Sequence, residues 1–462
     1  MSLPPVFAAS ALYDQLLQGA LRQFFDRATF ETEPTPSLSS DGRLAIEPTG
    51  DPSVLSVRWF GTRHVLHVPA SRPFTAHEVR LARAIGSVLA TRYRAIFDPR
   101  QMVERGDLFR GAIEDRYIGA FLDEGAYARQ DRRRADLVAG VIEVLRVAAL
   151  SSYENRAISS GVLLLERRTD GAEEVSAPDS QAYPYSQALT SIKSFYRVCD
   201  GVETLFLVNA DGMVLDIIDV VRWPNGPEGE RLPTAHDAPL DVTCPAAYRA
   251  HALATAGNRH ICVVLSPNHE IKVFAEGVEM FSFGNARWHL LDLRAKYELW
   301  SAAVGNAPLA ERLLQTALDL ADARQGALFV VLRDPAASLP VLVAPQDQLD
   351  SPFAQAARPG APPGRTQLMY MLRGRTAMSI DPAVLAGLAR IDGATVVDPS
   401  GRILAAGAIL LHAEPIEPHS TLPVEGARTT AAMTAGRHGP VLKVSEDGVV
   451  TFYDRQERIW DI

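Results

Sequence analysis

The stretch from residue 388 to residue 411, LARIDGATVVDPSGRILAAGAILL, places the tightest constraint on the fold. It contains two apolar runs, and Pro399-Ser400-Gly401 between them is turn chemistry, because glycine accepts a positive φ. The stretch therefore predicts two buried strands joined by a turn. Asp392 stands with Gly393 at the mouth of this hairpin. Its carboxylate has two open interpretations: it caps the turn, or it faces a ligand.

The composition is that of a globular protein of two or three domains. The chain has 462 residues, of which 47% are hydrophobic and 22% are charged, and its net charge is −9. This charge disfavours nucleic acid as a general partner. Three cysteines without a CxxC motif disfavour disulfides and zinc and favour a reducing compartment. No apolar run reaches the roughly 18–20 residues of a membrane span. We therefore expect a cytoplasmic protein with no membrane partner.

The first hundred residues predict a small α/β unit. Residues 9–30 have apolar side chains at helical spacing, and 54–59 and 64–68 alternate as strands do. Thr75 followed by Glu78 is typical of a capping box at a helix start. A strand–strand–helix order of this kind suggests a sensor-like unit, by analogy of fold alone.

The remainder of the chain presents one order of elements twice. Each copy has an apolar helix, a strand, an Asp-Gly pair before an apolar run, and later an arginine and a Val-rich strand. In the first copy the Asp-Gly pair is Asp200-Gly201, and in the second it is Asp392-Gly393. The interval from Arg249 to Ser266 also equals that from Arg428 to Ser445. We therefore predict a tandem repeat of one mixed α/β fold.

The predicted organisation has three parts. Residues 1–105 form the sensor-like unit, 106–300 a helical segment with the first copy, and 301–462 the second copy. The fold class is mixed α/β, with a mixed sheet flanked by helices in each copy.

Four short motifs in the second copy carry a resemblance to a known family. They are the strand 326–332 (GALFVVL), Asp392-Gly393-Ala394, residues 426–432 (GARTTAA) and residues 444–448 (VSEDG). In order and spacing they resemble the diadenylate cyclase (DAC) domain, the nucleotidyltransferase module shared with the bacterial DNA-integrity-scanning protein. The resemblance covers about residues 305–460. The first copy is similar to the sensor regions that precede DAC domains in some bacterial proteins.

The resemblance implies a function and a site. In the DAC family two facing domains each hold ATP and join the two molecules into cyclic di-AMP, with Mg²⁺ or Mn²⁺ as cofactor. Asp392 and Arg428 take the catalytic roles, and Asp392 with Glu446 the metal. The residues expected at the nucleotide are Gly393, Ala394, Gly426, Thr429, Thr430, Ser445 and Glu446. The two faces can pair within one chain or between chains of a homo-oligomer.

The chain departs from the family at one motif. Where the family has Thr-Arg-His-Arg, this chain has Ala427, Arg428, Thr429 and Thr430. A hydroxyl, an imidazole and a guanidinium are lost together, and losing one well-placed arginine in phosphoryl transfer can cost about 10³–10⁵ in rate. Three readings stay open: an active cyclase, a DAC-like module that binds a nucleotide without turnover, and a purely structural protein.

Overall fold

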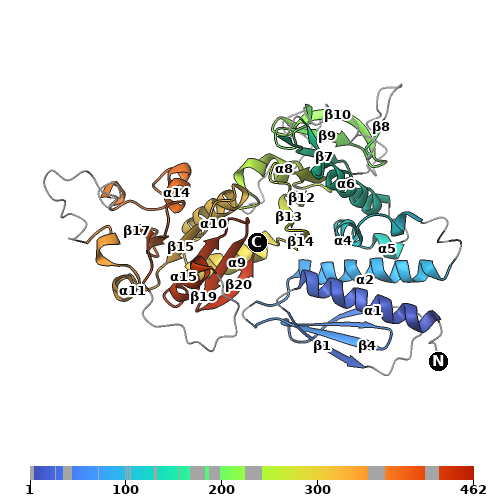
Figure 1. Ribbon diagram of the computed structural model, residues 1–462, viewed down its shortest axis with the longest axis horizontal. Coiled ribbons are helices and arrows are strands. Elements are labelled where there is room, and N and C mark those ends of the chain that lie inside the picture. The colour runs from blue at the N-terminus through green and yellow to red at the C-terminus, as the bar shows by residue number, and fades with distance from the viewer. Residues whose placement is uncertain are drawn as a thin grey trace. The chain divides into compact units, whose positions relative to one another are not determined.

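The computed structural model describes most of the chain and divides it into two compact units. The first unit is Met1–His236 with Ala250–Asp292, and the second is Asp237–Arg249 with Leu293–Ile462. The described residues are 5–25, 28–34, 44–70, 72–98, 100, 102, 106–129, 133–153, 156–166, 183–186, 198–223, 242–351, 370–411 and 426–462. Helices and mixed sheets alternate along the chain, so the predicted mixed α/β class is confirmed (Figure 1).

The first unit begins with a four-stranded antiparallel sheet and two long helices. The sheet has the order β1-β4-β3-β2. The elements are α1 (Pro5–Phe24), β1 (Thr29–Pro34), β2 (Ala45–Pro48), β3 (Val54–Trp59), β4 (Thr62–His67) and α2 (Ala76–Ile96). The predicted capping box is present, since Thr75 accepts from the Glu78 N–H while the Glu78 side chain accepts from the Thr75 N–H. The two predicted strands are present as β3 and β4 and pair as a hairpin, in whose turn Gly61 takes a φ of 84°.

An eight-stranded sheet completes the first unit. Its order is β14-β13-β12-β11-β7-β9-β10-β8. The strands are β7 (Ser160–Leu164), β8 (Tyr183–Pro184), β9 (Thr204–Val208), β10 (Met213–Asp219), β11 (Ile261–Leu265), β12 (Ile271–Ala275), β13 (Val278–Gly284) and β14 (Arg287–Leu290). Around them lie η1 (Gly106–Phe109), α4 (Ile113–Leu122), α5 (Ala126–Arg129), α6 (Arg133–Ala149), the short pair β5 (Ser152–Tyr153) and β6 (Arg156–Ala157), and α8 (Arg249–Ala254).

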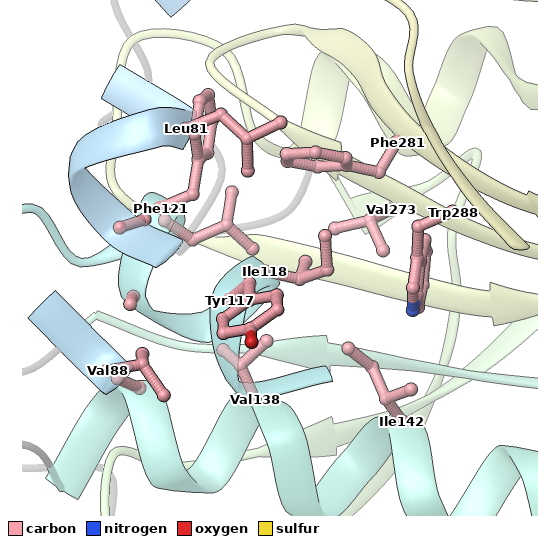
Figure 2. Close-up of a cluster of buried hydrophobic side chains, with 14 of the residues drawn as sticks. Leu81, Val88, Tyr117, Ile118, Phe121, Val138, Ile142, Val273, Phe281 and Trp288 are labelled. Carbon is pink, nitrogen blue, oxygen red and sulfur yellow. The ribbon is translucent and has the colours of Figure 1, made fainter. Parts of the chain in front are cut away.

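One hydrophobic core joins the parts of the first unit (Figure 2). Phe121 of α4 meets Phe281 of β13 edge to face, with ring centroids 4.8 Å apart. The Trp288 indole N–H donates to Asp115 at 2.9 Å, so this buried carboxylate is satisfied across helix and sheet. The core extends from Tyr13 to Trp288, and so it spans both predicted parts, 1–105 and 106–300. The three-domain division itself stays a prediction.

The second unit contains a six-stranded mixed sheet of order β17-β16-β15-β18-β19-β20. Its strands are β15 (Ala327–Val331), β16 (Ala394–Val397), β17 (Ile403–Ala408), β18 (Val441–Val444), β19 (Val450–Asp454) and β20 (Glu457–Asp461). Its helices are η5 (Ala246–Tyr248), α9 (Leu293–Val304), α10 (Ala307–Asp322), α11 (Pro335–Leu342), η6 (Pro345–Asp347), η7 (Tyr370–Leu372), α14 (Pro382–Ala389) and α15 (Ala427–Ala435). The hairpin predicted from the opening stretch is β16 and β17.

Alternation along the central strand gives the six-stranded sheet two buried faces. Leu328 and Val330 of β15 pack in one cluster with Ala432 and Ala435 of α15. The intervening residue Phe329 is completely buried and points to the opposite face, because successive strand side chains alternate. Helix α15 therefore lies against one face of the strands that it connects.

The two larger sheets share one topology. In the six-stranded sheet β15 is parallel to β16 and antiparallel to β18. In the eight-stranded sheet β7 is parallel to β9 and antiparallel to β11. The strands β10-β9-β7-β11-β12-β13 follow one another as β17-β16-β15-β18-β19-β20 do. Helix α6 contacts β7, β11 and β12, and α10 contacts β15, β18 and β19, which are the equivalent strands. The predicted repeat is present in the topology.

Among the helices in the described part of the chain, none is both long enough and apolar enough to span a membrane.

Candidate functional site

The strand directions of the six-stranded sheet bring the predicted site residues to one edge. Because β15 and β16 are parallel, they begin at the same edge, and β18, antiparallel to β15, ends there. Ala327 pairs with Val444, so Gly326 lies at the edge where Ser445 follows β18. In the parallel pair β15–β16, Phe329 lies opposite Thr395. Counting back three residues along each chain from this pair gives Gly326 and Asp392, which therefore lie at the same edge of the sheet. Neighbouring strands lie about 4.8 Å apart.

Arg428 lies against the start of β15. It is the second residue of α15, whose N-cap is Gly426. A Cβ at position 326 would overlap Nη1 of Arg428, so the guanidinium packs directly on Gly326. The glycine in the predicted Gly-Ala-Leu strand therefore makes room for a functional side chain of another motif, 102 positions away in the chain (428 against 326). The structure brings together two motifs that the sequence only places in order.

Arg428 forms an exposed ion pair with Glu446. Nη1 of Arg428 lies 3.2 Å from Oε1 of Glu446, and the two side chains are 37% and 72% exposed. Ion pairs of this exposure contribute about 0–1 kcal/mol, because water screens them and side-chain entropy opposes them. A phosphate, with more charge and more acceptor oxygens than a carboxylate, can therefore replace Glu446 at Arg428.

A second cation, Lys443, lies at the same helix turn. Lys443 Nζ donates to Oγ1 of Thr429 at 2.9 Å. Like Arg428, Lys443 sits where the α15 dipole is positive, and cations there are unfavourable until an anion is bound. In the part of the chain that the structure describes, no side chain caps α15 and no acidic residue occupies its first turn. This end of α15 therefore has the charge and the uncapped N–H groups that can accommodate an anion.

Lys443 was not among the residues predicted for the site. Its signal in the sequence is a lysine inside the otherwise apolar strand VLKV. It shares the α15 face with Val441, because the two are separated by one residue. Only the packing of α15 on that face shows that this lysine reaches Thr429.

Gly393 and Ala394 mainly join β16 to β17. Gly393 has a φ of +113°, and a Cβ there would overlap the Gly407 and Ala408 backbone of β17. Ala394 is fully buried and pairs with Ala408. The close backbone approach that the structure shows at the Asp-Gly-Ala motif is to β17. The predicted contact of these residues with a nucleotide stays a prediction.

The remaining predicted residues lie on the same elements. Asp392 precedes β16 and is exposed. Thr430 lies in α15, where its carbonyl accepts from the Thr434 hydroxyl at 3.0 Å. Ser445 closes the turn after β18, because its N–H and its hydroxyl both donate to the Val449 carbonyl. Ser445 thus positions Glu446 in the turn opposite Arg428.

The donor set fits a metal ion that arrives with a nucleotide. Among the described residues no group of three or more His, Cys, Asp or Glu is arranged to hold a metal. Mg²⁺, however, is commonly held by one or two carboxylates together with substrate phosphates. The exposed carboxylate of Asp392 suits that mode, and Glu446 is paired with Arg428. The metal roles of both residues stay predictions.

A scan against protein-family models finds no match for this chain, and a search of curated proteins finds none either.

Proposed function

We propose that the edge of the six-stranded sheet binds the triphosphate of ATP. The observation that carries the proposal is the placement of Arg428 on Gly326 at the N-terminus of α15, with Lys443 at the same helix turn. Two cations and a helix N-terminus together favour a multiply charged anion such as a triphosphate. The resemblance to the DAC domain selects ATP among such anions.

In this proposal each residue has a separate task. Arg428 leaves the Glu446 carboxylate and pairs with phosphate oxygens, since the ion pair that it leaves is exposed and weak. Lys443 adds charge from beneath the first turn of α15, through its bond to Thr429. Asp392 holds Mg²⁺ or Mn²⁺ together with the phosphates, and such a metal supplies Lewis-acid stabilisation of the transferring phosphoryl group.

A second candidate is the complete DAC reaction, the joining of two ATP molecules into cyclic di-AMP. The observation in its favour is the exposed carboxylate of Asp392, which precedes β16 at the same edge as Arg428. Phosphate binding alone does not require an acidic residue beside Arg428, whereas metal-assisted nucleotidyl transfer requires a carboxylate to hold the metal.

ATP with Mg²⁺ is expected to raise the midpoint of thermal unfolding, because a ligand that binds only the folded state stabilises it. At a concentration 100 times Kd the gain is about 2.7 kcal/mol. The same mixture, with Mn²⁺ as an alternative, is then examined for cyclic di-AMP by chromatography. Product that disappears in Asp392→Asn supports the cyclase, and stabilisation without product supports a binding module. If ATP with Mg²⁺ leaves the midpoint of thermal unfolding unchanged, the proposed ATP binding is wrong.

A further inference from the structure

We propose that the eight-stranded sheet has the same edge but has closed it with its own loop, so that each chain binds a single ATP, at the six-stranded sheet. This inference rests on the proposed function of the six-stranded sheet. The equivalent edge is where β7 and β9 begin, because these strands correspond to β15 and β16. Helix α8, which precedes β11, takes the place of α15.

The loop before β9 lies across the start of β7. Gly201 has a φ of +76°, and a Cβ there would overlap the backbone of Ser160. A Cβ on Gly161 would in turn lie 3.1 Å from the Cα of Gly201. In the six-stranded sheet the corresponding place, above Gly326, holds the movable and partly exposed side chain of Arg428. In the eight-stranded sheet the place above Gly161 is taken by the apolar side chain of Leu205, 2.5 Å from such a Cβ, together with the Gly201 main chain.

The carboxylate of Asp200 fixes this loop. Its Oδ1 accepts from the backbone N–H groups of Val202, Glu203 and Thr204, at 2.9, 2.8 and 3.0 Å. These bonds to the charged form lower the pKa of Asp200, against the desolvation that burial imposes as the largest single effect. A carboxylate with this many donors is committed to its turn. Asp200 therefore carries out the capping role that was one of the two readings of Asp392.

A buried histidine seals the loop from the other side. His251 of α8 is completely buried, and its Nε2–H donates to the Gly201 carbonyl at 2.9 Å. Cys199, also completely buried, lies next to the loop with Sγ 3.3 Å from the Gly161 carbonyl. At this edge α15 presents the partly exposed guanidinium of Arg428, whereas α8 presents the buried imidazole of His251, whose Nε2–H is already used. A triphosphate would have to expel this loop and break the hydrogen bond between His251 and Gly201. The arginine of α8, Arg249, lies two residues before His251 at the exposed start of the helix.

The count of sites follows from these contacts. Of the two equivalent edges in the described part of the chain, only that of the six-stranded sheet is open, so a reaction that joins two ATP molecules takes the second from another chain. The resemblance also allowed the two copies to pair within one chain. Such pairing would place the open edge of the six-stranded sheet against the closed edge of the eight-stranded sheet, which holds no ATP in this proposal.

Calorimetric titration of the full chain with ATP and Mg²⁺ tests the inference. We expect one ATP per chain, with binding weakened roughly ten- to a hundredfold in Arg428→Ala. We expect His251→Gln to leave the stoichiometry and the Kd unchanged, although it removes a buried hydrogen bond and lowers the unfolding midpoint. Two ATP per chain, or one ATP whose Kd is unchanged in Arg428→Ala and raised in His251→Gln, overturns the inference while nucleotide binding stands. Absence of any binding heat overturns the proposed function itself, and this inference with it.

Discussion

Replacing Arg428 with alanine is expected to weaken ATP binding by roughly ten- to a hundredfold. A hydrogen bond to a charged group contributes about 1.5–3 kcal/mol, and each 1.4 kcal/mol is a factor of about ten in Kd. Little of this is offset by losing the pair with Glu446, because that pair is exposed. The measurement is the fluorescence anisotropy of a labelled ATP analogue, titrated with wild type and variant at one salt concentration.

The chain offers a matched control for Arg428. Arg373 is also 37% exposed, and it pairs with Asp350 at 2.9 Å. Arg373→Ala changes the net charge equally and should leave the Kd unaltered. A further variant, Gly326→Ala, keeps the guanidinium but displaces it from its position on β15, and should weaken ATP binding less than Arg428→Ala. Equal binding by wild type and Arg428→Ala would show that the triphosphate binds elsewhere.

Gly393→Ala is expected to lower the stability of the second unit by about 2–4 kcal/mol. The new methyl group must be accommodated at a φ of +113°, where a side chain is strained, and against the backbone of Gly407 and Ala408, which cannot rotate away. The β16–β17 hairpin must shift to admit it. The midpoint of thermal unfolding, followed by circular dichroism, should therefore fall by several degrees.

Gly387→Ala is the control for this substitution. Gly387 lies in α14, and a Cβ there meets nothing within 4 Å. An alanine in an exposed helix interior should raise stability by roughly 0.5–1 kcal/mol relative to glycine. If Gly393→Ala instead behaves like Gly387→Ala, then β17 does not pass against Gly393, and the arrangement of the site's edge is wrong.

The helices and strands of this fold could be predicted from the sequence, because the residues that determine each element are close together in the chain. The hairpin of β16 and β17 follows from two apolar runs around Pro399-Ser400-Gly401, and the start of α2 from the Thr75–Glu78 box. The repeated order of helix, strand and Asp-Gly also led to the repeated topology, because strand order follows the order of connections in both sheets.

The site was less accessible to sequence reasoning, because its contacts join distant segments. Nothing local to Gly326 indicates that Arg428 will rest on it, and nothing local to Lys443 indicates Thr429 as its partner. Both contacts depend on how α15 packs across β15 and β18, which is a tertiary property.

The two Asp-Gly pairs show the same limit. Asp392 is followed at once by β16, which begins at Ala394, whereas β9 begins only at Thr204. The two extra residues after Gly201, Val202 and Glu203, allow the loop to fold back, and the Asp200 carboxylate binds their N–H groups. Two motifs that look alike in sequence therefore precede their strands by different distances, and only for Asp200 does the structure show the turn-capping role.

The central claim is that ATP binds at the edge of the six-stranded sheet, and photolabelling tests it most directly. The full chain is irradiated with an azido derivative of ATP, in the presence and absence of excess ATP, and the labelled peptides are identified by mass spectrometry. We predict protectable labelling of peptides around Gly326, Asp392 or 426–446. Protectable labelling confined to residues 1–292 would contradict the claim.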